Sequence, residues 1–327
     1  MKSQNIAADS EARSARNLRN ARVHNRLQAF LPLIGLLIIV AAFAGLTDGQ
    51  IVTMRSVRLI LSQVYPLMIA STGVFMVMTL GSLDFSQGSI LGISSIVISW
   101  LSFYSIPLAI VGGILTGAAI GLMNGFFHVS FRIPSFIVTI CTMYLFRGLC
   151  AYLTTDAPVA AMPSITALNQ DWIKLAITAG VLLAAFLVFR FTRIGIDLKA
   201  IGAGELAARY SGVRTDLVKV LAFVAAGAIT GIAAFVNVVK VGSITSTAGN
   251  QFETQILIAL VLGGLPISGG AKVRFSNIII GTLISLILNN GLVMIGLDTA
   301  MQQLIKGVIF LAVVALTIDR KSLKVIK

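Results

Sequence analysis

Long apolar runs of roughly 17 to 25 residues recur along the chain and are separated by short polar segments. A helix of about 20 apolar residues spans the roughly 30 Å hydrocarbon core of a bilayer. When run length is read first and Gly, Ser and Pro interruptions second, the pattern predicts ten spans. They cover residues 27–46, 59–80, 86–103, 105–128, 133–153, 173–191, 215–239, 254–270, 275–293 and 297–318. Because small residues and proline interrupt 86–103 and 254–270, nine or eleven spans also fit.

The sequence therefore predicts an all-α polytopic membrane protein with about ten transmembrane helices, some broken or re-entrant. One membrane domain would cover 27–320, with tails at 1–26 and 321–327. Composition agrees, because 57% of the residues are hydrophobic and 11% are charged, against about 45–50% and about 25% in soluble domains. The net charge of +13 lies mostly at the ends of apolar runs, so we expect contact with membrane lipid and no nucleic-acid partner.

Lysine and arginine collect on one side of the predicted bundle, as they do in cytoplasmic loops. With the N-terminus inside, the cytoplasmic set is Lys2, Arg13, Arg16, Arg19, Arg22, Arg26, Arg132, Arg190, Arg193, Lys199, Arg209, Arg214, Lys219, Lys272, Arg274, Arg320, Lys321, Lys324 and Lys327. The remaining six are Arg55, Arg58, Arg147, Lys174, Lys240 and Lys306. Segment 154–171 contains no Lys or Arg and is expected to lie outside the cell. With ten spans and the N-terminus inside, both termini are therefore predicted to be cytoplasmic. A signal sequence cleaved after Ala42-Phe43-Ala44 is the alternative, but the basic region before it is longer than usual.

The longest polar stretch between spans is 192–214, and its second half has the features of a short helix. Glu205 lies in the first turn, Arg209 follows at i+4, and Gly212 suits the left-handed conformation that ends helices. Such a helix on the cytoplasmic face would expose a small, flat surface for another protein, formed by Ala207, Ala208 and Tyr210. The alternative is an ordinary solvated loop.

Two glycine-interrupted stretches, 80–88 and 262–270, end apolar runs and share the pattern L-G-x-L-x-[FI]-S-x-G. Paired breaks in membrane helices mark translocation sites in many transporters. The span count places both stretches on the same side of the membrane, so inverted symmetry does not follow from them. Two glycine-rich turns between spans explain the echo equally well.

Polar residues inside or near the spans are expected to face the protein interior, because burying an ionisable group in hydrocarbon costs several kcal/mol. They are Asp84, Asn124, Thr139, Thr142, Arg147, Glu253, Gln255, Asn289, Asn290 and Lys306. Amides and hydroxyls suit a neutral, hydroxyl-rich solute, although hydrogen bonding between helices is an equal alternative for each residue. Small residues at four-residue spacing in 112–125 predict close helix packing and no chemistry.

The sequence lacks the motifs of several functional classes of protein. The chain has no G-x-x-x-x-G-K-[ST] loop, and Gly269-Gly270-Ala271-Lys272 lacks the required spacing. The two histidines, His24 and His128, are too few and too distant for a metal cluster or a catalytic triad. Cys141 and Cys150 would be about 13 Å apart on one helix, too far for a disulfide. We therefore expect no enzyme activity, metal or cofactor.

Ordered motifs from about residue 30 to 320 resemble the permease subunits of bacterial ABC importers for monosaccharides, the ribose, xylose and arabinose branch. Gly81 to Ser89 is similar to that family's G-G-I-D-L-S-V-G-S segment, and Gly121 to Gly125 and Ile137 to Gly148 also follow the family pattern. The most specific match is Gly195 to Val213, similar to G-R-x-x-x-A-I-G-G-N-E-x-A-A-R-L-S-G-I. It departs at Ile196-Asp197 and at Ala203-Gly204.

This resemblance implies a transmembrane subunit that transports a monosaccharide by alternating access, located in the bacterial inner membrane. It also implies a cytoplasmic ATP-binding subunit, a second permease copy or paralogue, and a periplasmic or lipid-anchored sugar-binding protein. The coupling surface would include Glu205, Ala207, Ala208, Arg209 and Gly212. The substrate pathway would include Asp84, Ser86, Asn124, Glu253 and Asn290. An ion-coupled transporter using Asp84 or Glu253, and a passive channel, are the alternatives.

Overall fold

The computed structural model describes residues 32–317, so the predicted tails 1–26 and 321–327 and the outer ends of the first and last spans lie outside the described residues. The first described helix is Pro32–Leu46. The other elements are η1 (Gln50–Val52), α2 (Met54–Thr79), α3 (Gln87–Ser102), α4 (Ile106–Ser130), α5 (Ser135–Leu153), β1 (Val159–Ala160), α6 (Pro163–Thr166), α7 (Asp171–Phe191), α8 (Arg193–Ala203), α9 (Glu205–Tyr210), α10 (Thr215–Val241), β2 (Ser243–Ile244), α11 (Phe252–Leu262), α12 (Ser276–Met294) and α13 (Thr299–Thr317).

The prediction of a polytopic helical membrane protein is confirmed. Six helices, α2, α4, α5, α7, α10 and α12, are long and apolar enough to cross a membrane, and four further apolar helices are shorter. These ten helices follow the order of the ten predicted spans. The predicted span 254–270 is wrong in length, because its helix ends at Leu262. Gly264 at φ 87° and Pro266 then interrupt the helix, while Leu265 keeps the run apolar and is itself buried.

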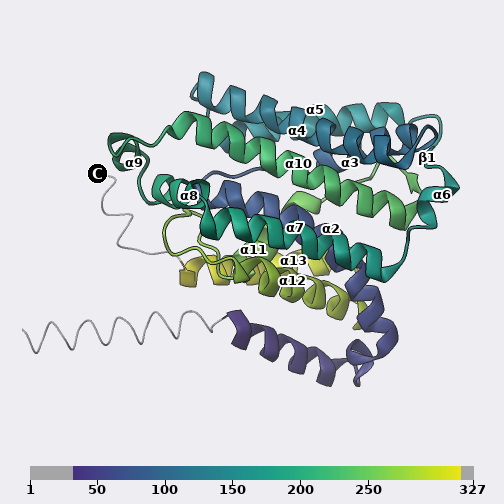
Figure 1. Ribbon diagram of the computed structural model, residues 1–327. Coiled ribbons are helices and arrows are strands. Elements are labelled where there is room, and N and C mark those ends of the chain that lie inside the picture. The colour runs from purple at the N-terminus through teal and green to yellow at the C-terminus, as the bar shows by residue number, and fades with distance from the viewer. Residues whose placement is uncertain (1–31, 318–327) are drawn as a thin grey trace, which may run out of the picture.

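Helix α2 is the centre of the bundle. Every residue from Val64 to Leu80 is buried, and the helix packs against α10, α12, α7 and α11. A helix that is apolar all round can be surrounded by lipid or by protein, and the burial of α2 shows that protein surrounds this part of it. Figure 1 shows the helices stacked along one common direction, with α8 and α9 at one end and α6 and β1 at the other.

Helices α4 and α10 make the closest packing in the bundle. The backbone of Gly117 lies against that of Gly227, and the backbone of Gly121 lies against the Phe223 carbonyl, so neither α4 glycine has room for a Cβ atom. Gly113, Gly125 and Gly231 continue the same contact. Small residues at four-residue spacing allow helix backbones to approach this closely. The predicted scaffold role of the glycines in 112–125 is confirmed.

The bundle contains two units of the same design that run in opposite directions. Each unit consists of a long helix, a largely non-helical segment, a short helix and a second long helix. In the first unit these are α2, 80–86, α3 and α4, and in the second they are α10, 242–251, α11 and α12. Helix α10 packs on α4 and α3, and α2 packs on α12 and α11. Helix α2 ends where Thr79 meets Gly202 of α8, beside the start of α10. This is the inverted repeat typical of transporters, which the sequence echo at 80–88 and 262–270 did not show.

Candidate functional site

The first break in the bundle is the segment 80–86, which carries the chain from α2 back into the protein. Gly81, at φ 79°, turns the chain. The N–H of Leu83 then donates to Ser135 Oγ at 3.1 Å, and the N–H of Phe85 donates to Thr139 Oγ1 at 3.1 Å. Both hydroxyls belong to α5. Unpaired backbone groups are costly in a membrane, so these side chains make the non-helical backbone tolerable.

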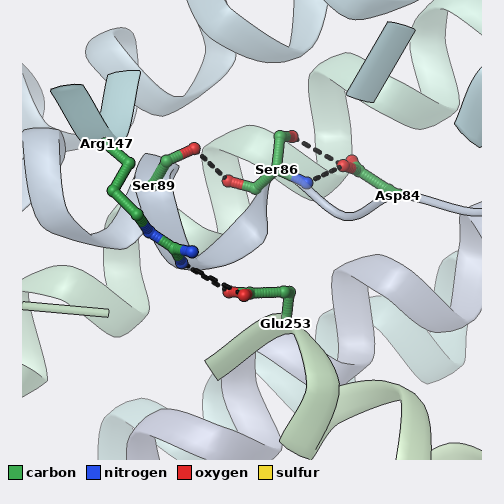
Figure 2. Close-up of polar contacts among 5 residues, drawn as sticks. All are labelled: Asp84, Ser86, Ser89, Arg147 and Glu253. Atoms are coloured by element: carbon green, nitrogen blue, oxygen red, sulfur yellow. Dashed lines mark hydrogen bonds and ion pairs between the residues drawn. The ribbon is translucent and has the colours of Figure 1, made fainter. Parts of the chain in front are cut away.

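Asp84 organises a fully buried polar cluster at this break. Its carboxylate accepts hydrogen bonds from Ser86 N at 2.9 Å, Ser86 Oγ at 2.6 Å and Gln87 Nε2 at 2.6 Å. Ser86 Oγ also accepts from Asn124 Nδ2 of α4 at 2.8 Å, and Gln87 accepts from Thr230 of α10. Figure 2 shows how Asp84, Ser86 and Ser89 follow one another at the start of α3. The cluster therefore ties the break to both α4 and α10.

Three predicted pathway residues, Asp84, Ser86 and Asn124, are thus brought together, but at most 1% of each is exposed. A side chain that meets a passing solute has to reach water at some stage of transport. These three residues are instead enclosed by protein and bonded to one another. We propose that their role is to hold the break in place.

Replacing Asp84 by alanine is expected to destabilise the folded protein. The Ser86 N–H, the Ser86 hydroxyl and the Gln87 amide would lose their acceptor in a buried site, at a cost of about 1–3 kcal/mol for each unsatisfied donor. Thermal unfolding of the detergent-purified protein measures this, with Asp84→Asn as a milder variant that keeps one acceptor. Asp156→Ala, in an exposed loop, is the control. Unchanged unfolding of Asp84→Ala combined with lost uptake would assign Asp84 to the pathway.

A second polar site lies where the short helices α3 and α11 begin. The Arg147 guanidinium of α5 donates to Glu253 of α11, with Nη2 at 3.1 Å from Oε1 and 3.2 Å from Oε2 (Figure 2). The Glu253 side chain is 7% exposed and the Arg147 side chain 27%. Gly88 of α3 lies against both Glu253 and the backbone of Gly249. The two interrupted regions therefore meet inside the bundle, at the Arg147–Glu253 ion pair.

The segment preceding α11 is polar and open. Thr245, Ser246, Thr247, Asn250 and Gln251 are all exposed, although this segment leads inward to the ion pair. Non-helical backbone at membrane depth is tolerated where it is buried in protein or lines a water-filled cavity. Exposed hydroxyls and amides favour the second explanation.

A third polar group joins α2, α12 and α13. Asn290 Nδ2 donates to Gln63 Oε1 at 2.9 Å, and Lys306 Nζ donates to Asn289 Oδ1 at 2.6 Å. Asn290 is buried, whereas Gln63, Asn289 and Lys306 are partly exposed. The five predicted pathway residues therefore do not form one site. Asn290 lies in this group, Glu253 at the ion pair, and the other three in the buried cluster.

Gln63 and Arg147 were absent from the predicted pathway set, although the sequence did carry a signal for Arg147. An ionisable residue inside an apolar run is expensive, and such residues mark functional sites. Lys306 carries the same signal. What the sequence could not supply was their partners, because Glu253 lies 106 residues away from Arg147 and Gln63 lies 227 residues away from Asn290.

The predicted coupling loop 192–214 consists of two helices, α8 and α9, of which only the second was predicted. Gly212 takes the expected left-handed conformation, at φ 87°. Although Glu205 and Arg209 are four residues apart, Glu205 pairs with Lys219 at 2.5 Å and Arg209 with Asp216 at 3.5 Å, because α10 folds back beside α9.

The exposed surface of α9 also differs from the prediction. Ala208 is 4% exposed and contributes to the core, so it is not part of a free surface. The accessible apolar residues are Ala207, Leu206 at 70% exposure and Tyr210 at 90%. A leucine and a tyrosine exposed on a helix held by two ion pairs form a rigid apolar surface suited to a protein partner.

Helix α8 meets both glycine-interrupted stretches at one joint. Gly202 lies against the carbonyl oxygen of Thr79 and the backbone of Gly270, with no room for a Cβ atom. Gly270 N–H also donates to the Thr79 carbonyl at 3.1 Å. Gly269 packs against the backbone of Gly81. The two stretches predicted as an echo therefore contact each other, and α8 touches both.

Comparisons with known proteins agree over most of the chain. A family model described as "Branched-chain amino acid transport system / permease component" matches residues 56–314. The ribose import permease protein of Escherichia coli (strain K12) is 30% identical over 302 residues, covering 89% of this chain and 93% of that protein. The D-allose transport system permease protein of the same strain is 29% identical over 290 residues, with coverage of 86% and 89%. The xylose transport system permease protein of Haemophilus influenzae is 25% identical over 367 residues, with coverage of 90% and 97%. No solved structure matches the chain.

Proposed function

Because the chain belongs to the permease family described as "Branched-chain amino acid transport system / permease component", we propose that it is the transmembrane subunit of an ATP-driven importer. In this proposal it carries a monosaccharide inward by alternating access, and a separate subunit hydrolyses the ATP. The observation that carries the proposal is the meeting of two interrupted regions inside an inverted repeat, the arrangement in which transporters place their substrate site.

The end of the bundle that carries α8 and α9 is proposed to face the cytoplasm, with both termini on that side of a bacterial inner membrane. Two sets of basic residues support this orientation through the bias of cytoplasmic loops toward Lys and Arg. The α8–α9 end has Arg132, Arg190, Arg193, Lys199, Arg209, Arg214, Lys219, Lys272 and Arg274, whereas the opposite end has Arg55, Arg58, Lys174 and Lys240.

The pathway is proposed to run past the Arg147–Glu253 pair and the partly exposed amides of α2 and α12. Polar side chains that stay partly exposed at membrane depth face water or another protein chain. Gln63, Asn289 and Lys306 fulfil this condition, so a second permease copy or paralogue would complete the pathway on their side. Amide and hydroxyl groups both donate and accept hydrogen bonds, which suits a neutral polyol.

Helix α9 is proposed to dock the cytoplasmic ATP-binding subunit. Two ion pairs fix α9 against α10, so the exposed Leu206 and Tyr210 are presented on a rigid base. Closure of the ATP-binding subunits would push α8 and α9 and be transmitted through Gly202 to the glycine-interrupted stretches 80–88 and 262–270. A periplasmic or lipid-anchored binding protein would deliver the sugar at the opposite end.

The substrate class follows the relatives, which are named for ribose, D-allose and xylose, although the family description names branched-chain amino acids. Uptake of radiolabelled ribose, xylose, D-allose and leucine by a deletion strain carrying the gene for this chain separates the two classes. We expect saturable uptake of one sugar, and none when the ATP-binding subunit is deleted. Leucine uptake alone would contradict the sugar assignment, and uptake that survives this deletion but stops with an uncoupler would indicate ion coupling.

The docking role of α9 has its own test within the same assay. Leu206→Asp combined with Tyr210→Ala is expected to prevent copurification of the ATP-binding subunit and to abolish uptake. A charge and a lost ring in the centre of an apolar contact typically remove 2 kcal/mol or more, a loss of about 30-fold in affinity. Tyr104→Ala, at an 81% exposed tyrosine at the opposite end, is the matched control. Normal copurification by the double variant would refute docking at α9.

A further inference from the structure

An apolar groove of about 460 Å³ lies between α7 and α10. Met76 of α2 forms its floor, and Val181 and Val188 of α7 face Ile232 and its neighbours on α10. Ile194 and Leu198 of α8 close it at the end where α8 and α9 lie. Every lining residue is Met, Val, Ala, Ile or Leu. Ala184, Ile194 and Leu221 are exposed, so the groove opens on the outer surface of the bundle, where lipid lies in a membrane.

The dimensions of the groove fit one lipid chain. On α10 the lining extends from Val218 to Ile232, about 21 Å at 1.5 Å per residue. One leaflet is half of the roughly 30 Å hydrocarbon core, or about 15 Å, so the groove is long enough to hold an acyl chain over the full depth of a leaflet.

Positive charge gathers at the α8 end of the groove. Arg193 precedes Ile194, and Arg214 precedes Val218 by four residues, one turn away, whereas Arg190, two residues after Val188, lies at this end on the other side of α7. Within residues 32–317, no ion pair joins these three arginines to an acidic side chain. The acids at this end of these elements are Glu205 and Asp216, already paired with Lys219 and Arg209, and the partly exposed Asp197.

Lys199 adds to this charge. Burial and the nearby charge of Arg190 hold the pKa of Lys199 below its usual range, and its Nζ lies 4.4 Å from the centre of the Phe189 ring. Four basic side chains thus share this end with one unpaired carboxylate, Asp197. An anionic group at the mouth of the groove would offset this excess of positive charge.

We propose that this groove binds an acyl chain of an anionic phospholipid whose headgroup lies on Arg193 and Arg214. The chain fills the space under α8 and joins α7 to α10 at the base of the α8–α9 unit. The lipid is therefore a structural ligand of this subunit. The inference concerns a different surface from the transport pathway and stands independently of the solute that is carried.

Native mass spectrometry of the detergent-purified full-length permease tests the proposal. Phosphatidylglycerol and phosphatidylethanolamine with identical acyl chains are the two probes. One phosphatidylglycerol is expected to be retained per chain in preference to phosphatidylethanolamine. Ala184→Trp, which fills the groove, is expected to lower retention at least about tenfold, because it displaces the chain. Leu183→Trp, at an exposed position on the same helix outside the groove, is the matched control and should retain lipid normally.

The headgroup contact has a separate variant. Arg193→Gln combined with Arg214→Gln is expected to reduce the preference for phosphatidylglycerol by roughly 30-fold, since each basic residue near an anionic headgroup contributes to binding. Thermal unfolding verifies that each variant is folded. Equal retention of the two lipids by the unmodified protein, or unchanged retention by Ala184→Trp, would overturn the proposal. So would an altered oligomeric state of Ala184→Trp with lipid binding intact, because the groove would then be a contact between permease copies.

Discussion

Gly202→Val is expected to uncouple ATP hydrolysis from uptake while the bundle remains assembled. At this position α8 touches the Thr79 carbonyl and the Gly270 backbone, and both neighbours are backbone atoms that cannot rotate aside. A valine side chain would push α8 away from the glycine-interrupted stretches 80–88 and 262–270. Overpacking of this kind costs about 1–3 kcal/mol, which corresponds to a roughly 5- to 150-fold loss if the cost falls on coupling between the sites.

Gly204, two residues further along the chain, provides the control for Gly202. A Cβ atom at Gly204 would meet only the Ala207 Cβ, at 3.9 Å, so Gly204→Ala should transport normally. Gly202→Ala should lie between Gly204→Ala and Gly202→Val. The measurements are ATP-driven uptake, ATPase activity and thermal unfolding of the reconstituted complex. Normal uptake by Gly202→Val, or an equal loss in Gly204→Ala, would show that the contact transmits nothing.

The close packing at Gly202 also explains why the two glycine-interrupted stretches resemble each other. Each supplies backbone to a contact that leaves no room for a side chain at Gly81, Gly269 or Gly202. Gly81 and Gly269 also have positive φ angles of 79° and 67°, which residues with a Cβ rarely adopt. Both stretches therefore share a pattern because both pack backbone against backbone at the same end of the bundle. The inverted repeat, which relates 80–86 to 242–251, has no comparable signal in the sequence.

The sequence predicted what depends on run length and spacing. The spans follow from apolar length, and the α4 glycines follow from their four-residue period. The sequence failed at the end of α11, because buried non-helical residues such as Leu265 are as apolar as a helix. It also failed for pairs set by tertiary structure. Glu205 could not be assigned to Lys219 without knowing that α10 turns back beside α9.

The predicted pathway set shows the same limit. Of the five residues that the family resemblance placed in the substrate pathway, the structure connects Asp84, Ser86 and Asn124 by hydrogen bonds. Residue type alone does not distinguish a carboxylate that meets water from one that holds a loop. Burial decides between these roles, and burial depends on α4 and α10 closing over the break.

Glu253→Ala is expected to have the largest effect of any single change in the proposed pathway. It would leave the Arg147 guanidinium without its partner beside the N-termini of α3 and α11, which carry partial positive charge. Breaking a fully buried pair costs about 3–5 kcal/mol, and the partial exposure of Arg147 reduces this to roughly 2 kcal/mol, or about 30-fold in uptake. Because Glu253 lies in the first turn of α11, Arg147→Gln should cost less than Glu253→Ala.

A double-mutant cycle distinguishes this pairing from two independent roles. Arg147→Gln combined with Glu253→Gln removes both charges and is expected to retain more uptake and stability than the sum of the two single variants, Arg147→Gln and Glu253→Gln, implies, with a coupling energy well above about 0.5 kcal/mol. Asp171→Ala, which breaks the Lys174–Asp171 pair at a 67% exposed aspartate, is the control and should change uptake little. Additive effects of the two substitutions would show that Arg147 and Glu253 act separately. A non-additive result would instead identify the pair as the contact joining α5 to α11 at the point where the two breaks meet, so that any opening of the pathway there has to separate or move it.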